Sequence, residues 1–214
     1  MKRVYFVRHG ESTFNAGGPI LPEDEILLSE KGKEQARFLG QRASKLPIDV
    51  IIASSIRRAR DTAHYIAEAV NKPIETSDLF IERVHPSGQH GLPSDHPMVQ
   101  EITRNLMERF GDESYRHSDE EDFESMKKRA IAGLDLLRSR PEENILVVTH
   151  GIFLRVLLAV ALYGEKLTQF EAGRIAKAFK TKNTGLSLLE YGAMHEGNAP
   201  EWSVRTWNDH AHLG

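Results

Sequence analysis

The chain has 214 residues, of which 40% are hydrophobic and 28% charged, a composition typical of a soluble globular protein with a substantial core. Its net charge of −3 lacks the strongly basic character that favours nucleic acid or an anionic membrane surface as a partner, so we expect neither. The sequence has no cysteine but ten histidines, which excludes disulfides and thiolate chemistry and leaves imidazole chemistry open.

In the first third of the chain, short apolar runs alternate with helical periodicity. Residues 4–7 are an apolar run typical of a buried strand, and Ser29 is expected to cap a helix that ends at Pro47. Residues 50–53 predict a second strand, and apolar residues at helical spacing predict a helix over 56–70. This alternation is typical of an α/β protein.

The middle of the chain continues the alternation. Residues 79–81 predict a short third strand, and apolar stripes predict helices near 99–110 and 123–137. Residues 145–148 predict a fourth strand, which runs into an apolar helix over 152–163. Strands that alternate with helices imply a mostly parallel sheet with helices on both faces.

The C-terminal part of the chain differs from this pattern. Residues 186–191 and 203–207 predict two strands that form a hairpin or edge pair across 192–200. We therefore expect a three-layer α/β/α sandwich with a mostly parallel central sheet and an antiparallel edge near the C-terminus. No linker or repeat divides the chain, so residues 1–214 are expected to be a single domain, with 111–122 as a polar, solvated loop.

One apolar stretch is nearly long enough to cross a bilayer. Residues 145–163 are strongly apolar, but His150, Gly151 and Arg155 interrupt them. We interpret the stretch as a strand followed by a buried helix. The basic residues at 1–3 are not followed by the apolar segment of a signal peptide, so we expect a cytoplasmic protein.

Residues suited to phosphate binding and proton transfer follow each of the four strands predicted in the first 150 residues. They are Arg8, His9, Asn15, Arg58, Glu82, His150 and Gly151. Ligands of open parallel sheets bind beyond the carboxyl ends of the strands, so these residues are expected to meet at one edge.

These residue types suit phosphoryl transfer through a covalent histidine. A neutral imidazole such as His9 is a competent nucleophile near pH 7. Arg8, Arg58 and a protonated His150 can stabilise the charge on the transferred group without a metal. Glu82 is placed to protonate the leaving group, because a phosphate dianion nearby favours a protonated carboxyl.

Five blocks along nearly the whole chain carry a family resemblance. They are Arg8-His9-Gly10-Glu11-Ser12 with Asn15; Leu28-Ser29-Glu30-Lys31-Gly32 with Gln35-Ala36; Ser54, Ser55, Arg58-Ala59 and Thr62-Ala63; Glu82; and Val148-Thr149-His150-Gly151. In this order and spacing they resemble the histidine phosphatase superfamily, the phosphoglycerate-mutase-like phosphatases. The resemblance implies the phosphoglycerate-mutase-like fold.

The resemblance also implies a role for each matching residue. His9 would accept the phosphoryl group, and Glu82 would protonate the leaving group and then activate water. The family needs no metal, and we expect no cofactor. The residues that would hold the phosphoryl group are Arg8, Asn15, Arg58 and His150, with the Gly151 amide in support.

The segment after Glu82 departs from the pattern of many members. Members often show a glycine and a second glutamate after the acid, whereas residues 83–91 are Arg-Val-His-Pro-Ser-Gly-Gln-His-Gly. Cofactor-dependent mutases carry extra basic residues there, whereas the segment from Val84 to Arg104 holds no Lys or Arg between its ends. We therefore expect hydrolysis of a small-molecule phosphomonoester.

The alternatives are a cofactor-dependent phosphoglycerate mutase and a catalytically silent phosphate-ester-binding or interaction module. The substrate and the oligomeric state stay open.

Several other polar residues have simpler explanations. Arg57 and Arg60 are expected on the exposed face of the helix that carries Arg58, and Ser54 in a turn or cap. The acidic run over 118–122 is expected to be the solvated start of a helix. Three histidines with no metal-ligand spacing are expected in a loop bordering the site, and two in the C-terminal tail. These are His85, His90 and His96, and His210 and His212.

Overall fold

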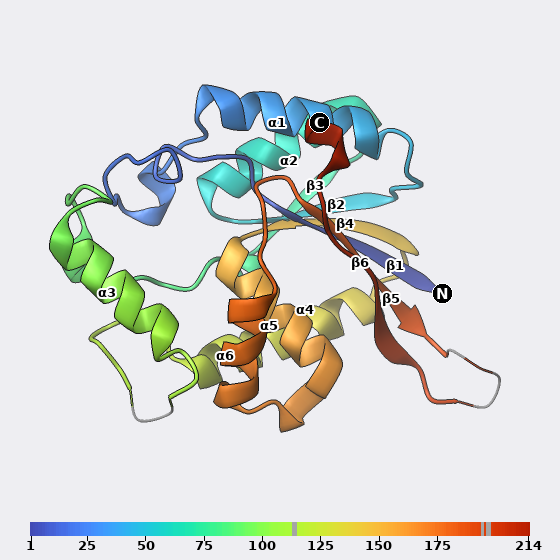
Figure 1. Ribbon diagram of the computed structural model, residues 1–214. Coiled ribbons are helices and arrows are strands. Elements are labelled where there is room, and N and C mark those ends of the chain that lie inside the picture. The colour runs from blue at the N-terminus through green and yellow to red at the C-terminus, as the bar shows by residue number, and fades with distance from the viewer. Residues whose placement is uncertain (113–114, 194, 196–197) are drawn as a thin grey trace.

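The computed structural model describes residues 1–112, 115–193, 195 and 198–214. Within them, a sheet of order β3-β2-β4-β1-β5-β6 lies between two layers of helices (Figure 1). The strands are β1 (Lys2–Arg8), β2 (Val50–Ser54), β3 (Ile74–Ser77), β4 (Asn144–Thr149), β5 (Leu186–Gly192) and β6 (Glu201–Asp209). The α-helices are α1 (Glu30–Ala43), α2 (Arg57–Val70), α3 (Pro97–Glu108), α4 (Phe123–Ser139), α5 (Gly151–Tyr163) and α6 (Gln169–Ala178).

The sheet has a parallel part and an antiparallel edge. Strands β3, β2, β4 and β1 are parallel, whereas β5 is antiparallel to β1 and β6 is antiparallel to β5. The expected three-layer sandwich with an antiparallel C-terminal edge is confirmed. Parts of the predicted 192–200 turn and of the predicted 111–122 loop lie outside the described residues.

Alternate residues of the central strands face two separate cores. Phe6 and Val147 pack with α4, α5 and α6 on one face, while Val7 and Val148 pack with α1 and α2 on the other. The central strands are therefore buried on both faces, which explains why they are continuous apolar runs in the sequence.

The third strand differs from its prediction. It spans Ile74–Ser77 instead of 79–81, and Asp78–Phe80 forms a 3-10 turn, η2. This turn directs Phe80 into the core, where it packs closely against Gly133 of α4. The apolar triplet therefore reflects core packing, whereas the true strand lies at the sheet edge and is mostly polar.

The helices largely follow the sequence pattern, with two differences. Ser29 caps α1 by accepting a hydrogen bond from the Gly32 amide, as predicted, but the helix ends at Ala43, before Pro47 is reached. Helix α6 was not predicted. Its signal is a capping box, in which the Thr168 hydroxyl and the Glu171 carboxylate each accept a backbone hydrogen bond.

The topology brings the ends of β1 and β4 together. Arg8 pairs with Thr149 in the parallel register, so His9 and His150, each one residue beyond, are neighbours. The chain leaves β1 toward the α1 side and leaves β4 toward the α5 side (Figure 1). Ligands of open parallel sheets bind where the chain diverges in this way. Helix α3 lies away from the sheet, beside these strand ends. In the described part of the chain, no helix is long and apolar enough to span a membrane.

Candidate active site

His9 lies directly after β1 and is only 3% exposed. Its Nδ1 is 2.7 Å from the carbonyl oxygen of Gly10, which can only accept, so Nδ1 carries the proton. Nε2 is then unprotonated, and its lone pair accepts a hydrogen bond from Arg58 Nε at 3.2 Å. Burial and the positive charges of Arg58 and Arg8 hold the pKa of His9 well below its usual range. The ring is thus neutral near pH 7, and Nε2 is the ring atom that is able to act as a nucleophile.

The turn that follows His9 packs tightly against the start of α1. A Cβ on Gly10 would lie 2.4 Å from the Gly32 carbonyl oxygen, and one on Gly32 would lie 1.9 Å from that of Glu11. Only glycine fits at both positions. The Glu11 carboxylate accepts hydrogen bonds from Ser29 and Lys31, which further fixes this turn.

Arg8 and Asn15 form one side of the site. Arg8 Nη1 donates to the Thr181 carbonyl oxygen at 2.9 Å, and Nη2 donates to Asn15 Oδ1 at 3.4 Å. The Nε of Arg8 is buried without a partner among the described residues, which leaves a donor for a ligand. Asn183 donates to both Asn15 Oδ1 and the His9 carbonyl oxygen, a link between distant segments that was not predicted from the sequence.

Arg58, near the start of α2, lies opposite and is 5% exposed. Besides donating to His9, it forms an ion pair with Glu23, whose Oε2 lies 2.7 Å from Arg58 Nη1. Arg57 and Arg60 are exposed, as predicted. Glu23 was not predicted as a site residue.

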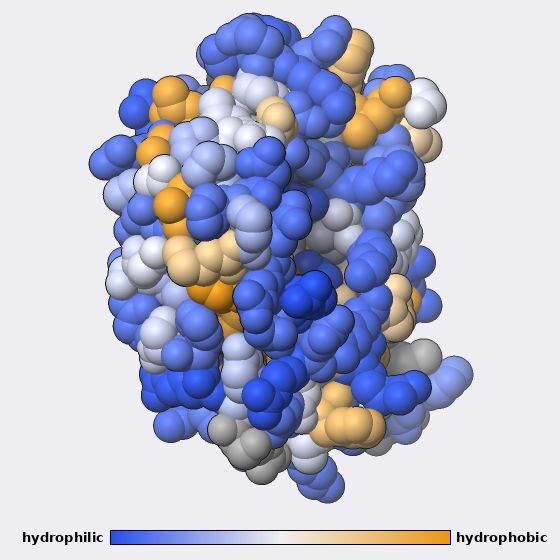
Figure 2. All heavy atoms as spheres, turned by 60° about the vertical axis from the view of Figure 1, so that its left-hand side comes forward, coloured by the Kyte–Doolittle hydropathy of each residue, from blue (hydrophilic) through white to orange (hydrophobic). Residues whose placement is uncertain are grey.

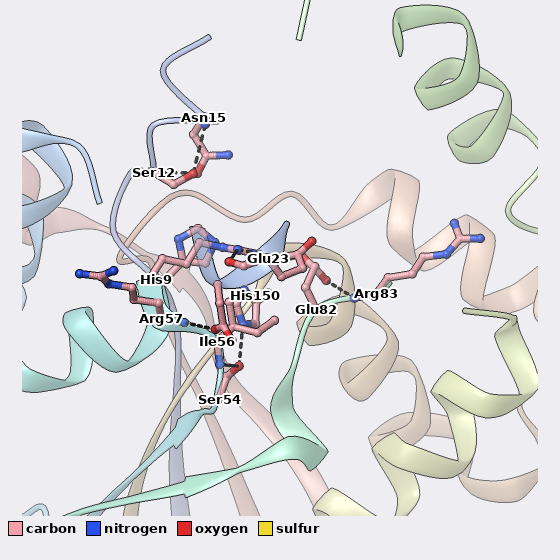
Figure 3. Close-up of polar contacts among 12 residues, drawn as sticks. His9, Ser12, Asn15, Glu23, Ser54, Ile56, Arg57, Glu82, Arg83 and His150 are labelled. Atoms are coloured by element: carbon pink, nitrogen blue, oxygen red, sulfur yellow. Dashed lines mark hydrogen bonds and ion pairs between the residues drawn. The ribbon is translucent and has the colours of Figure 1, made fainter. Parts of the chain in front are cut away.

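His150 lies behind His9, with the ring centroids 5.0 Å apart (Figure 3). Its Nε2 is 2.8 Å from Ser54 Oγ, and its buried Nδ1 has no partner within the described residues. Burial and the charges of Arg58 and other neighbours hold the pKa of His150 well below its usual range. The structure therefore favours a neutral His150, in contrast to the protonated ring expected from the sequence. Ser54 holds the turn by accepting from the Ile56 amide and also positions His150.

Glu82 follows η2 and reaches the N-terminus of α5. Its carboxylate accepts hydrogen bonds from the backbone amides of Phe153 at 2.9 Å, Ile152 at 3.2 Å and Arg83 at 3.0 Å. Burial alone raises the pKa of Glu82, but the Phe153 hydrogen bond and nearby positive charges outweigh it, so the pKa is lowered overall. The carboxylate is therefore ionised near pH 7.

These groups surround one cavity of about 370 Å³. Of the seven predicted site residues, six line it; His150 does not, because it lies beneath His9. The outer part of the cavity is lined by residues that were not assigned from the sequence. They include Arg83, Gln89, Thr103, Leu106, Met107, Arg155 and Lys180. The strand ends point toward the face drawn in Figure 2, where hydrophilic side chains cover most of the surface.

The other polar residues have mixed outcomes. His85 lines the cavity, whereas His90 is exposed and His96 caps α3 through Nδ1. His212 is half-buried, with its ring nitrogens against Thr184 and Arg42, so it is more than a tail residue.

The acidic run over 118–122 does begin a helix, because Asp122 caps α4. Glu120 was expected to be solvated, but it is 2% exposed and accepts hydrogen bonds from the His117 and Ser118 amides. In the described ranges, no group of three or more His, Asp or Glu side chains is arranged to hold a metal ion.

Known proteins resemble this chain over its whole length. It is similar to a protein named probable phosphoglycerate mutase GpmB of Erwinia tasmaniensis, with 31% identity over all of this chain and 95% of that protein. It is 28% identical to a protein of Bacillus subtilis named uncharacterized phosphatase PhoE, over all of this chain and 97% of that protein.

Solved structures show the same fold. A mycobacterial glucosyl-3-phosphoglycerate phosphatase superposes with a TM-score of 0.77 at 20% identity, covering 97% of this chain and 99% of that one. A phosphoserine phosphatase of Entamoeba histolytica superposes with a TM-score of 0.75 at 24% identity over the full length of both. The model of the histidine phosphatase superfamily (branch 1) matches residues 4–210. The chain therefore belongs to the histidine phosphatase superfamily, as its sequence blocks indicated.

Proposed function

We propose that this chain is a phosphomonoester hydrolase that forms a phosphohistidine on His9 and needs no metal or cofactor. Its substrate would be a small-molecule phosphomonoester in the cytoplasm, with no nucleic acid or membrane partner. The observation that carries the proposal is the hydrogen bonding of His9, in which Nδ1 donates to Gly10 and Nε2 keeps its lone pair. This is the tautomer that a nucleophilic Nε2 requires.

In the first step, the Nε2 lone pair of His9 forms a bond to phosphorus. The bond from phosphorus to the leaving oxygen breaks, its electron pair stays on that oxygen, and the protonated Glu82 carboxyl supplies a proton. Glu82 is ionised in the structure, but a bound phosphate dianion raises the pKa of a neighbouring carboxyl and so favours its protonation. Arg8 and Arg58 stabilise the charge on the phosphoryl oxygens, and neutral His150 packs against the His9 ring from outside the cavity.

In the second step, water attacks phosphorus and the N–P bond breaks, returning its electron pair to Nε2. The Glu82 carboxylate, left ionised by the first step, takes the proton from that water. The Gly10 carbonyl keeps the imidazole oriented throughout, because it accepts from Nδ1 in both steps. Free phosphate and the original protonation states result.

Turnover of p-nitrophenyl phosphate in the presence of EDTA tests the proposal. The His9→Ala variant should lose about a thousandfold or more in kcat, as expected when a covalent nucleophile is removed. His90→Ala, which changes an exposed histidine outside the cavity, should keep its activity. Equal turnover by wild type and His9→Ala, or strict dependence on added metal, would overturn the mechanism. Rapid quenching in alkaline denaturant should trap a phosphoenzyme that is stable to alkali and labile to acid, only when His9 is present.

A phosphoglycerate mutase is the second candidate, favoured by the name of the 31% identical relative. The absence of Lys and Arg between Val84 and Arg104 supports hydrolysis instead. With 3-phosphoglycerate as substrate, a mutase would isomerise faster than it released phosphate. A catalytically silent binding module would bind vanadate but yield no trapped phosphoenzyme.

A further inference from the structure

Glu23 places a negative charge inside the part of the cavity that holds phosphate. It lines the cavity, and its Oε2 lies 2.7 Å from Arg58 Nη1. The same Nη1 also donates to the Glu23 backbone carbonyl oxygen at 3.3 Å. One nitrogen of Arg58 thus donates a hydrogen bond to the Glu23 backbone and also forms an ion pair with the Glu23 carboxylate, whose buried Oε2 has no hydrogen-bond partner among the described residues.

The neighbouring residues hold Glu23 in this place. It begins the 3-10 turn η1 (Glu23–Glu25), which packs against the N-terminus of α2. The Asp24 carboxylate accepts a hydrogen bond from the Arg57 amide at 3.3 Å. The contact between Glu23 and Arg58 is therefore supported by a second contact between the same two elements.

A phosphoryl group on the cavity side of His9 must come close to this carboxylate. The nucleophilic Nε2 is 3.2 Å from Arg58 Nε, and Glu23 sits on another nitrogen of the same guanidinium. A phosphate dianion and a carboxylate repel one another at such separations, and they compete for the positive charge of the same guanidinium. Binding phosphate at Arg58 therefore weakens or displaces the Glu23 contact.

We infer that Glu23 is a specificity-determining residue, whose carboxylate competes with the phosphoryl group for Arg58. This inference rests on the proposed function of the same site. Because the phosphoryl group gains little net affinity at Arg58, the leaving group in the outer cavity supplies most of the binding energy. Substrates with leaving groups that fill the outer cavity are selected, and free phosphate leaves readily after hydrolysis.

Calorimetric titration with inorganic phosphate tests the inference without requiring turnover. Glu23→Gln keeps the shape of the side chain and removes its charge, so it should bind phosphate about tenfold more tightly than wild type. Glu25→Gln is the matched control, because it removes an equal charge from an exposed position of the same turn. It should change phosphate affinity by less than about twofold.

Steady-state kinetics adds a readout that a purely structural role would not move. Glu23→Gln should lower the inhibition constant of phosphate and lower KM most for substrates with small leaving groups. Equal phosphate binding by Glu23→Gln would show that the carboxylate does not compete with phosphate, and weaker binding would show that it orients Arg58 for phosphate; either result overturns the inference. If the amide variant fails to fold, Glu23→Ala removes the same charge and is expected to tighten phosphate binding in the same way. An inactive wild type that still shows the tenfold difference would refute only the proposed reaction.

Discussion

The two ends of the cavity are built in different ways. At the phosphate end, where we propose that the phosphoryl group binds, His9 and His150 extend from paired strands, and their separation is set by the sheet register. At the outer end, Gln89 comes from a segment without strands, Leu106 from α3, which lies away from the sheet (Figure 1), and Arg155 from α5. Residues on strands are held more rigidly than residues on loops, so the reaction centre is fixed and the outer end is free to vary.

The arginines of the two ends also differ in where their hydrogen bonds go. At the phosphate end, Arg8 has a buried Nε without a partner among the described residues. At the outer end, Arg155 donates to the carbonyl oxygens of Gly151 and Ala176, which holds α5 and α6 together. Lining the cavity is therefore not sufficient evidence of a role in binding, and variants must separate the two ends.

The largest effect in this comparison is expected from Glu82→Gln, which removes the proposed proton donor at the phosphate end. For alkyl phosphates, kcat should fall by about a hundred- to a thousandfold, the size of general acid catalysis. The loss should be smaller for p-nitrophenyl phosphate, because its leaving group departs without a proton. Comparison of kcat for the two substrates measures this difference.

A matched control separates catalysis from the helix-capping role of Glu82. Glu171→Gln also alters a carboxylate that accepts a hydrogen bond from backbone at a helix N-terminus, but it lies outside the cavity. It should lower the thermal midpoint and leave kcat unchanged. If Glu82→Gln reduced kcat equally for both leaving groups, Glu82 would not be the proton donor.

A smaller effect is expected from Ser54→Ala, which acts through His150. Loss of the hydroxyl leaves His150 Nε2 without a partner, and kcat should fall about tenfold, since one buried hydrogen bond contributes roughly that factor. KM should change less than kcat, because Ser54 does not line the cavity. The control is Ser187→Ala, which removes another fully buried serine hydroxyl. The Ser187 hydroxyl accepts a hydrogen bond from the Asn208 amide of β6. Equal kcat values for the two variants would exclude a positioning role for Ser54.

The difference between the ends also explains what the sequence could predict. Strands β1, β2 and β4 are buried on both faces, so each is an unbroken apolar run, and the reactive residues follow directly at the strand ends. Strand β3 lies at an edge, where Glu75 and Thr76 carry no apolar signal. Its predicted position was therefore wrong, although the residue that follows the predicted strand, Glu82, still lines the cavity.

Contacts between distant loops could not be predicted in the same way. Asn183 joins the site from 174 residues after His9, and no periodicity or motif marks it. Glu23 lies in an acidic turn whose sequence is typical of an exposed loop, and only the packing of η1 on α2 brings it to Arg58. Side-chain contacts of this kind depend on where two irregular segments meet, which neither apolar patterning nor strand order specifies.

The smallest effect is expected at the outer end, from Gln89→Ala. Gln89 is 2% exposed and lines the cavity, and its buried Nε2 has no acceptor in the described part of the chain. A leaving group that offers an oxygen to this donor should lose about three- to tenfold in kcat/KM, mostly through KM. Phenyl phosphate, which offers no such oxygen, should be hydrolysed as by wild type. Gln100→Ala, at an exposed position of α3, controls for general loss of stability. A fall in kcat for phenyl phosphate would mean that the outer end also positions the reaction centre, and the two ends would then act as one unit.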